Sequence, residues 1–472
     1  MNTKAELIKQ IDELFNPRSV AIVGAPRGVK SGSVFLTALL DQGFAGSIYP
    51  VNRRADSING LKAYASVSDI PGPVDLAIVL VPHQHSLAVL KECAAKGVKG
   101  AVLFTAGYKE TGTREGRALE AQLVKVARSA GMRLIGPNGM GLYSPKSGLS
   151  FFPQMSTVPG PVGIVSHSGS LTNIMGVMAS QKGIRFSKVI SLGNECDLSA
   201  ADFFTYLGND PETGVIGSYL EGIKNGPDLF NALREASLQK PVILWKVGLT
   251  PEGSRASASH TGALSGSGRI WQAVVRQCGL IPVTGFEPFV DALMGFSLLP
   301  LEAGPRLAII SGPGGSAVAA AEACGTEGLM LAELSENTRS ELAKFVPSTG
   351  TSLHNPVDVS LTAHFDLSIF GKSTETVAAD SAVDAIAIIG CGLTPEENQR
   401  FVEQMIKIRK TCRKPLLMVE IPGFDPTLGQ QFCDAGLPFF QSAERAIHTY
   451  ALVYNYRRWR REHVKNIVSN QV

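Results

Sequence analysis

The 472-residue sequence lacks the cysteine patterns that mark disulfide-rich proteins and zinc sites. Its seven cysteines are widely scattered, their number is odd, and no two of them are spaced as Cys-x-x-Cys. This usage argues for reduced thiols. We therefore expect a cytoplasmic protein with neither a disulfide framework nor a bound metal.

Long apolar runs and a strong net charge are also missing. No apolar run reaches the roughly 18 residues that a membrane-spanning helix needs. The N-terminal stretch MNTKAELIKQIDELF has the pattern of an amphipathic helix and not of a signal peptide, so we expect no membrane association. The net charge of +3 is too small to indicate nucleic acid binding, and the clearest basic cluster, YRRWRREH, is local and C-terminal.

One pattern occurs three times along the chain. It reads SVAIVGAPRG from Ser19, PVGIVSHSGS from Pro161 and RLAIISGPGG from Arg306. Each copy is a short apolar run followed by a Gly/Ser turn and a stretch compatible with a helix, which is how a βαβ unit begins. Further apolar runs, such as DLAIVLVP, GVIGSYLEG and AIAIIGCG, are typical of parallel strands that are covered on both faces. We expect three consecutive α/β domains with parallel sheets, over residues 1–150, 151–302 and 303–472.

The turn of the first copy, GAPRGVKSG from Gly24 to Gly32, matches neither the dinucleotide motif GxGxxG nor the phosphate loop GxxxxGK[ST]. It still suits phosphate, because glycines expose backbone N–H groups at a helix start and Arg27 and Lys30 add positive charge. The next strand, SIYPVN, ends in Asn52, Arg53 and Arg54, where an NAD site usually has an acidic residue. Basic residues there favour a ribose with an extra phosphate, as in NADP or coenzyme A. A solvated basic turn is the alternative.

The second copy is followed by three features on the same expected sheet edge. Ser168, Gly169 and Ser170 open a helix and could cradle an oxyanion, although a plain serine cap has the same pattern. Glu221 ends the strand GVIGSYLEG. His260 lies in the small-residue stretch SRASASHTGALSGSG after the next strand, and we expect this stretch to be a loop.

A carboxylate that binds one imidazole nitrogen leaves the other nitrogen free to attack. Glu221 and His260 therefore form a candidate catalytic pair. His167 is a second imidazole close by in the sequence, and for it we expect a structural role.

The motifs NPRSVAIVGA, GSIYPVN, RLIGPNGMG, GIVSHSGSLT, YLEG, SASHTGALSG and NPVDV occur in this order. With them the chain resembles, over nearly its whole length, the α subunit of ADP-forming acyl-CoA synthetases (acetate–CoA ligase, ADP-forming), which are relatives of succinyl-CoA synthetase. The resemblance implies a Rossmann-like CoA-binding domain followed by two flavodoxin-like ligase domains. It also implies the interconversion of acyl-CoA, ADP and phosphate with carboxylic acid, CoA and ATP, through acyl-phosphate and phosphohistidine intermediates.

The resemblance also implies residue roles. His260 would be the phosphohistidine on a mobile loop, Glu221 the carboxylate that orients it, and Ser168, Gly169 and Ser170 the phosphate-binding residues. The residues that would bind coenzyme A are Gly24, Ala25, Pro26, Arg27, Gly28, Lys30, Ser31, Asn52, Arg53, Arg54, Val81, Pro82, Phe104, Thr105, Ala106 and Asn138.

The family's ATP-grasp domain, which binds the nucleotide, has no counterpart that we recognise in this sequence. We therefore expect ATP or ADP, with Mg, to bind a partner β subunit in a hetero-oligomer such as α2β2. The remaining substrates would be phosphate and a small carboxylic acid or its acyl-CoA, and the sequence does not indicate which acid. The alternatives are an NADP-dependent oxidoreductase and a non-catalytic CoA-binding regulatory module. For the turn Gly312–Ser316 we expect a structural role, with a phosphate or interface site as the alternative.

Overall fold

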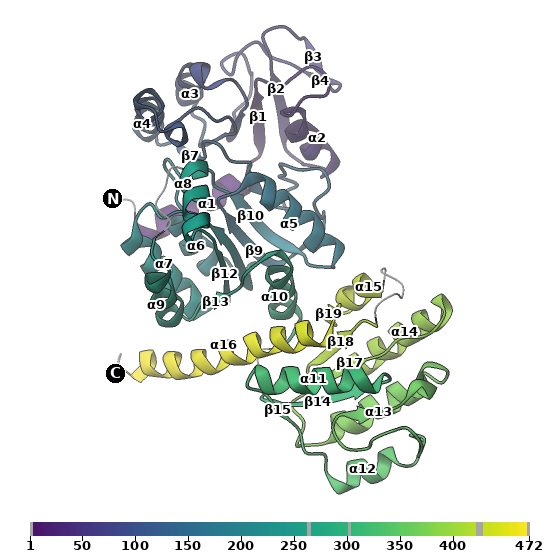
Figure 1. Ribbon diagram of the computed structural model, residues 1–472. Helices are drawn as coiled ribbons and strands as arrows, with labels where there is room; N and C mark the ends of the chain where they lie inside the picture. Colours follow the sequence, from purple (N-terminus) through teal and green to yellow (C-terminus); the bar gives the residue numbers. More distant parts are fainter. Residues whose placement is uncertain (1–2, 262–265, 301–303, 422–427, 470–472) are drawn as a thin grey trace. The chain divides into compact units, whose positions relative to one another are not determined.

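The computed structural model describes residues 3–261, 266–300, 304–421 and 428–469. The chain divides into two compact units, Met1–Ser180 with Arg185–Thr284, and Gln181–Ile184 with Gly285–Val472. The first unit holds two of the main sheets and the second unit holds the third (Figure 1). Among the described residues, no helix combines the length and the apolar character that crossing a membrane requires.

The first sheet is parallel, with the strand order β2-β1-β5-β6-β7. Every residue of β1, β5 and β6 is buried, as expected for short apolar strands covered on both faces. The strands are β1 (Ser19–Val23), β2 (Ser47–Val51), β5 (Leu76–Val79), β6 (Gly100–Leu103) and β7 (Arg133–Ile135), with a small hairpin of β3 (Ser57–Ile58) and β4 (Leu61–Lys62). The helices are α1 (Lys4–Phe15), α2 (Ser33–Asp41), α3 (His83–Lys96) and α4 (Arg114–Ser129), with a 3₁₀ turn at Lys109–Thr111.

The second sheet has the order β13-β12-β11-β9-β10-β8, and β8 is its antiparallel edge strand. Its strands are β8 (Gly141–Tyr143), β9 (Pro159–Ser166), β10 (Phe186–Ser191), β11 (Val215–Leu220), β12 (Val242–Lys246) and β13 (Ile281–Pro282). Its helices are α5 (Gly169–Gln181), α6 (Ala200–Asn209), α7 (Gly226–Gln239), α8 (Pro251–Thr261) and α9 (Gly268–Cys278).

The apolar patterns of the sequence do not predict strands β8 and β10, and Lys188 shows why β10 is hard to recognise. This lysine interrupts the apolar pattern of the strand, yet its side chain is buried. Its Nζ donates to Asp210 Oδ2 at 2.9 Å and to Glu212 Oε2 at 2.7 Å. These two ion pairs offset the desolvation free energy of the buried ammonium group. A buried lysine with two carboxylate partners therefore masks the apolar pattern of a strand in the interior of the sheet.

The third sheet has the order β15-β14-β17-β18-β19, and β16 also pairs with β14. The strands are β14 (Arg306–Ser311), β15 (Met330–Leu331), β16 (Val357–Asp358), β17 (Ala385–Ile389), β18 (Leu416–Val419) and β19 (Phe439–Phe440). The helices of this unit are α10 (Phe286–Leu298), α11 (Gly314–Thr326), α12 (Glu336–Leu342), α13 (Ser368–Ala379), α14 (Pro395–Thr411), α15 (Leu428–Asp434) and α16 (Ala443–Ser469), with a 3₁₀ turn at Leu361–His364. Helices α10 and α16 are joined by Arg445, whose Nε and Nη2 donate to Asp291 at 2.6 and 2.9 Å.

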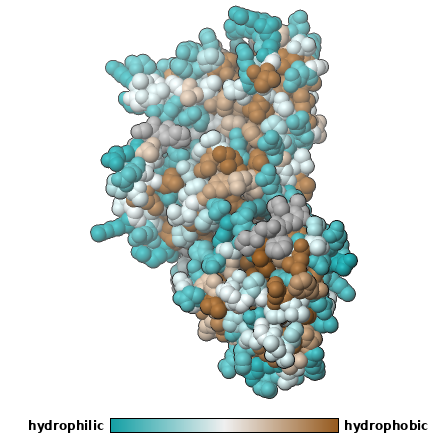
Figure 2. Space-filling view, turned by 45° about the vertical axis from the view of Figure 1, so that its right-hand side comes forward, coloured by the Kyte–Doolittle hydropathy of each residue, from teal (hydrophilic) through white to brown (hydrophobic). Residues whose placement is uncertain are grey.

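Several large apolar side chains of the second unit are exposed. Val318, Leu361, Phe365 and Leu393 follow the carboxyl ends of β14, β16 and β17. Hydrophobic side chains also gather in the lower part of the face shown in Figure 2. Apolar surface of this kind is characteristic of contact regions in proteins.

The three main sheets share one topological feature. The first parallel strand of each, β1, β9 or β14, lies between the strand that follows it and a later strand, which is β5, β11 or β17. At such a switch point the chain leaves neighbouring strands in opposite directions, and the crevice at their carboxyl ends is where α/β proteins bind ligands. The parallel α/β class predicted from the sequence is confirmed, whereas the exact domain boundaries stay a prediction.

The loop predicted for 254–268 is wrong for its first half, because residues 251–261 form helix α8. The helix starts after Thr250, whose Oγ1 accepts the N–H of Gly253 at 3.0 Å, with Pro251 at its first position. The alanines among the small residues of this segment favour a helix, since alanine has the highest helix propensity. The side chain of His260 lies outside the described residues.

Candidate functional site

The glycine turn after β1 is tied to the end of β2. The N–H groups of Gly24 and Ala25 both donate to the carbonyl of Val51, at 3.0 and 3.2 Å. The side chain of Asn52 then donates to the carbonyl of Ala25 at 2.8 Å. Gly24 has a φ of +85°, and a Cβ there would lie 2.9 Å from Val81 Cγ1. This position at the switch point of the first sheet therefore needs glycine for both its conformation and its space.

Four basic side chains surround this turn. Arg27 and Lys30 lie on the turn itself, and Arg53 and Arg54 follow β2; all four are exposed. The N–H of Arg54 donates to Asn52 Oδ1 at 2.8 Å, which connects the two basic segments. The structure thus brings together the residues predicted to hold a phosphorylated ribose, and their exposed charges suit a polyanionic ligand.

The other predicted coenzyme A residues continue along the same sheet edge. Thr105 Oγ1 donates to the carbonyl of Val81 at 3.0 Å, and the N–H of Asn138 donates to the carbonyl of Thr105 at 3.2 Å. The ring of Phe104 packs edge-on against Phe35, with ring centroids 5.0 Å apart. These contacts connect the carboxyl ends of β5, β6 and β7. The remaining predicted residues lie on the same turns, at Pro26, Gly28, Ser31, Pro82 and Ala106.

The predicted phosphate residues lie at the start of α5, beside the switch point of the second sheet. The hydroxyl of Ser168 accepts the N–H of Leu171 at 3.3 Å, as a helix cap does. The first-turn N–H groups of a helix have no partner within it, so the N-terminus of α5 favours a negatively charged group. The cap and the phosphate interpretations are compatible, because Ser168 satisfies one of several such donors.

A pocket of about 320 Å³ joins the two predicted sets of residues. It is lined by Phe104, Asn138, Gly139, Met140, His167, Ser168, Gly169, Ser170, Asn173, Gly193 and Asn194. Phe104 and Asn138, two of the residues predicted to bind coenzyme A, therefore face the same cavity as the start of α5. Sequence analysis missed Gly193 and Asn194, and the signal that could have found them is the turn SLGNECD at the end of β10.

Glu221 follows β11 and is buried. Its N–H donates to His167 Nδ1 at 3.0 Å, and its carbonyl accepts Lys246 Nζ at 2.8 Å and Ser257 Oγ at 3.3 Å. Burial lowers the pKa of Lys246 to about 8, although the charge of Glu221 opposes this effect. The main chain of Glu221 is thus held on both sides. One of its partners, Ser257, belongs to the helix that carries His260.

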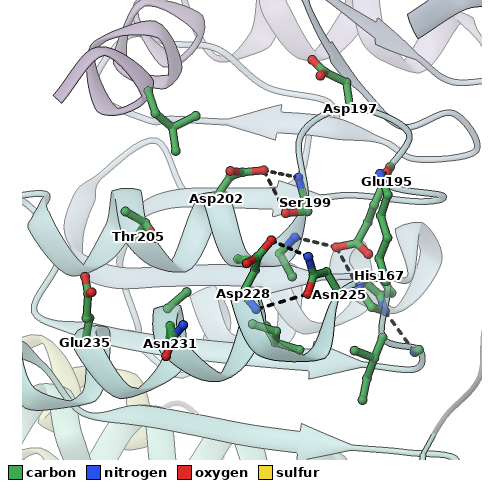
Figure 3. A pocket seen from close by; sticks show the side chains of 18 of the residues that line it. His167, Glu195, Asp197, Ser199, Asp202, Thr205, Asn225, Asp228, Asn231 and Glu235 are labelled. Carbon is green, nitrogen blue, oxygen red and sulfur yellow. Dashed lines mark hydrogen bonds and ion pairs between the residues drawn. The ribbon is translucent and has the colours of Figure 1, made fainter. Parts of the chain in front are cut away.

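His167 separates the phosphate pocket from a second cavity of about 470 Å³, which is shown in Figure 3. On the side of the second cavity its Nε2 faces Glu195 Oε1 at 3.4 Å. Burial raises the pKa of the Glu195 carboxyl, but His167 and the N–H of Ala200 outweigh burial, so the pKa is lowered below its ordinary value. Glu195 is therefore an ionised carboxylate inside the protein. Within the described residues, no group of three or more His, Cys, Asp or Glu side chains is arranged to hold a metal ion.

Two family models match the chain. Residues 18–145 match a CoA binding domain, and residues 159–296 match the succinyl-CoA ligase like flavodoxin domain. The α subunit of acetate–CoA ligase [ADP-forming] II from Pyrococcus furiosus is 36% identical over 94% of this chain and 97% of that protein. The 4-hydroxybutyrate–CoA ligase [ADP-forming] of Nitrosopumilus maritimus is 32% identical over 94% of this chain, which covers 64% of that longer protein.

Among solved structures, the chain is similar to the dinucleotide-forming acetyl-coenzyme A synthetase 1 of Candidatus Korarchaeum cryptofilum in complex with phosphate and ADP. The TM-score is 0.87, the sequence identity is 32%, and the similarity covers 97% of this chain and 98% of that one. The likeness therefore extends over the described sheets of both units.

Proposed function

Because this chain belongs to the family of ADP-forming acetate–CoA ligase α subunits, we propose that it carries the coenzyme A site and the phosphoryl-transfer residues of an acid–CoA ligase. The observation that best supports this proposal is the pocket of about 320 Å³ into which Phe104, Asn138 and the start of α5 converge. A thioester held along the first sheet and a phosphate held at α5 would meet there. Such a meeting is what an acyl transfer to phosphate requires.

Coenzyme A is assigned to the carboxyl edge of the first sheet. Arg27, Lys30, Arg53 and Arg54 supply the positive charge that its phosphates require, and the Gly24 turn lets the ligand approach the backbone closely. Phe104 and Asn138 lie at the other end of this edge, where they line the pocket. The reactive sulfur is therefore assigned to the pocket and the charged end of the molecule to the basic turns.

The proposed reaction has three balanced steps. Phosphate attacks the thioester carbonyl, which releases CoA and forms an acyl phosphate. His260 then attacks the phosphorus, the P–O bond to the acyl group breaks, and the carboxylic acid leaves as its carboxylate. Phosphohistidine finally passes the phosphoryl group to ADP, which gives ATP and frees the imidazole. Glu221 is assigned to orient His260 and to support its developing positive charge.

Helix α8 supports the pairing of His260 with Glu221. The hydroxyl of Ser257 donates to the carbonyl of Glu221, and His260 follows Ser257 by three residues in the same helix. Positions three apart in a helix are neighbours on its surface. The helix is thus anchored at the main chain of Glu221 by a residue one turn away from the proposed phosphohistidine.

A β subunit is implied by membership of an α-subunit family. We assign ATP, ADP and Mg to an ATP-grasp fold in that subunit, in an α2β2 or similar hetero-oligomer. The longer relative named above, of which this chain covers 64%, is consistent with a second part that is fused to it. We assign a small carboxylic acid as the substrate class, on the model of the two relatives named above, which are named for acetate and for 4-hydroxybutyrate.

The test is phosphorylation of the full chain, mixed with its β subunit, by γ-labelled ATP. This direction of the reaction forms phosphohistidine without any need to know the acid. The label should be lost in mild acid and kept in alkali, as expected for a phosphoramidate. His260→Ala should abolish labelling, and His167→Ala should retain it.

Glu221→Gln keeps the shape of the side chain and removes its charge. It should slow labelling by roughly 100-fold, within the range for loss of an acid–base partner. Normal labelling of His260→Ala would show that the proposed mechanism is wrong.

A further inference from the structure

His167 is a buried imidazole beside the proposed site that the proposed mechanism does not use. The N–H of Glu221 donates to its Nδ1 at 3.0 Å, and the N–H of Gly222 approaches the same atom at 3.4 Å. An imidazole nitrogen that accepts hydrogen bonds carries no proton. The neutral ring must then carry its proton on Nε2, the atom that faces Glu195 Oε1 at 3.4 Å (Figure 3).

Glu195, on the other side of this ring, is itself anchored. One carboxylate oxygen accepts the N–H of Ala200 at the start of α6, and its backbone carbonyl accepts Lys224 Nζ at 2.6 Å. Its backbone is held at a φ of +56°, which is unusual for a residue other than glycine. A backbone conformation of this kind persists where several surrounding contacts hold it in place. Glu195 therefore provides a fixed support and not a mobile side chain.

The main chain and the ring of His167 together connect β9 to β11 at the switch point. His167 follows β9, its own N–H donates to the carbonyl of Tyr219 in β11 at 3.1 Å, and its Nδ1 accepts the N–H of Glu221. The carbonyl of Glu221, in the next peptide group, accepts hydrogen bonds from Lys246 and Ser257. Removing the Nδ1 acceptor would free the N–H of Glu221 from His167 and leave this buried N–H without that partner.

We infer that His167 is a positioning residue, which holds the main chain of Glu221 in place through a neutral Nε2–H imidazole that is backed by Glu195. The inference rests on the proposed role of Glu221 toward His260. A side chain at this position needs a hydrogen-bond acceptor toward the N–H of Glu221 and a donor toward the carboxylate of Glu195, at a fixed distance from each other. A glutamine amide meets this requirement through its oxygen and its NH₂ group, whereas a leucine fills the space and meets neither.

The first test compares His167→Gln with His167→Leu in the complex of the full chain and its β subunit. His167→Leu should lower kcat and the initial rate of His260 labelling by roughly 10- to 100-fold, because small displacements of a catalytic group are costly. The KM for CoA should change less than threefold, and the final extent of labelling should stay the same. His167→Gln should restore the rate to within about fivefold of the wild type.

The matched control is His448→Leu. His448 is a half-buried histidine of the second unit, and its Nδ1 lies 2.8 Å from Glu327 Oε1. It is outside the site, so kcat should be unchanged in this variant. Equal rates for the wild type, His167→Leu and His167→Gln, with His260 still labelled in the wild type, would overturn the inference.

A second measurement does not depend on activity or on the stability of a variant. In the ¹⁵N-histidine-labelled wild type, long-range ¹H–¹⁵N spectra should show an imidazole with an unprotonated Nδ1 and a protonated Nε2 whose signal vanishes in His167→Gln, which assigns it to His167. A protonated Nδ1 on His167 would overturn the inference whatever the enzyme does. If His260 is not labelled at all in the wild type, the proposed function fails, and the expected tautomer remains testable by itself.

Discussion

Arg53 and Arg54 follow β2 with exposed side chains, beside the turn that begins at Gly24. If they face the 3′-phosphate of coenzyme A, replacing both with Ala should weaken the binding of CoA by roughly tenfold and that of dephospho-CoA much less. An ion pair contributes up to about 1 kcal/mol when it is exposed, and two such losses add when the sites are independent. Isothermal calorimetry with both ligands measures the difference.

The control for this prediction is Lys125→Ala, because Lys125 is an exposed cation on α4 outside the predicted site. Equal losses for CoA and dephospho-CoA would place the 3′-phosphate elsewhere. Stronger binding of NADP than of CoA by the wild-type chain would contradict the assignment of coenzyme A to the carboxyl edge of the first sheet.

Lys246 is a buried cation, with Nζ 5.3 Å from the centroid of the Trp271 ring and 2.8 Å from the carbonyl of Glu221. Burial lowers its pKa from 10.5 to about 8. Between these two pH values the unfolded chain binds a proton that the folded chain has lost, so this residue makes stability rise with pH across that window. Below pH 8 both states are protonated, and the contribution is constant.

We therefore expect the free energy of unfolding of the wild type, minus that of Lys246→Met, to increase from pH 8 to 10.5 and to be flat from pH 6 to 8. Urea unfolding, followed by tryptophan fluorescence, measures both proteins. The same substitution at an exposed position, Lys125→Met, is the control for the loss of a lysine charge. Parallel curves for the wild type and Lys246→Met would contradict the prediction.

Helix α8 is the element that connects the main chain of Glu221 to the proposed phosphohistidine. Ser257 is 5% exposed, and its hydroxyl donates to the carbonyl of Glu221. Ser257→Ala removes the hydrogen bond to Glu221 and should slow His260 labelling by less than about fivefold, because a neutral hydrogen bond contributes about 1 kcal/mol. Ser257→Trp cannot fit a buried small-residue position and should slow labelling by at least about 100-fold, since the helix would be displaced.

The matched control on the same helix is Glu252→Trp. Glu252 is exposed in the first turn of α8, so the bulky side chain should point into solvent and labelling should stay within about twofold. Rates measured by quenched labelling with γ-labelled ATP, together with circular dichroism of each variant, separate displacement of the helix from unfolding. Normal labelling of Ser257→Trp would mean that α8 is not packed at Glu221 during the reaction.

At the scale of the whole molecule, the matched CoA-binding and flavodoxin-like regions span 18–145 and 159–296, and a third α/β sheet follows. The purified chain alone should bind CoA and lack ATP-dependent thioester synthesis, because we assign the nucleotide to the β subunit. Adding that subunit should restore synthesis, with activity saturating at a fixed ratio of the two chains. A coupled assay of ADP release in the presence of acid and CoA measures this, and robust activity of the single chain would place a nucleotide site within it.

Local signals in the sequence were sufficient for much of the fold. Short Val- and Ile-rich runs followed by Gly/Ser turns mark β1, β9 and β14, because buried parallel strands and the helix starts after them impose that composition wherever they occur. Local signals also placed Glu221 at a strand end. They failed for β10, where Lys188 breaks the apolar pattern, and for α8, whose small residues are as compatible with a helix as with a loop.

By itself the sequence determined the α/β class, the positions of the glycine turns and the family, since each depends on the order of residues along the chain. Only the tertiary structure decided that Phe104 and Asn138 share a pocket with Ser168, and that His167 binds the main chain of Glu221. These contacts join residues that are between 30 and 64 positions apart, or 54 in the case of His167 and Glu221. They depend on which strands become neighbours, and strand order results from the packing of the whole sheet, which no local pattern encodes.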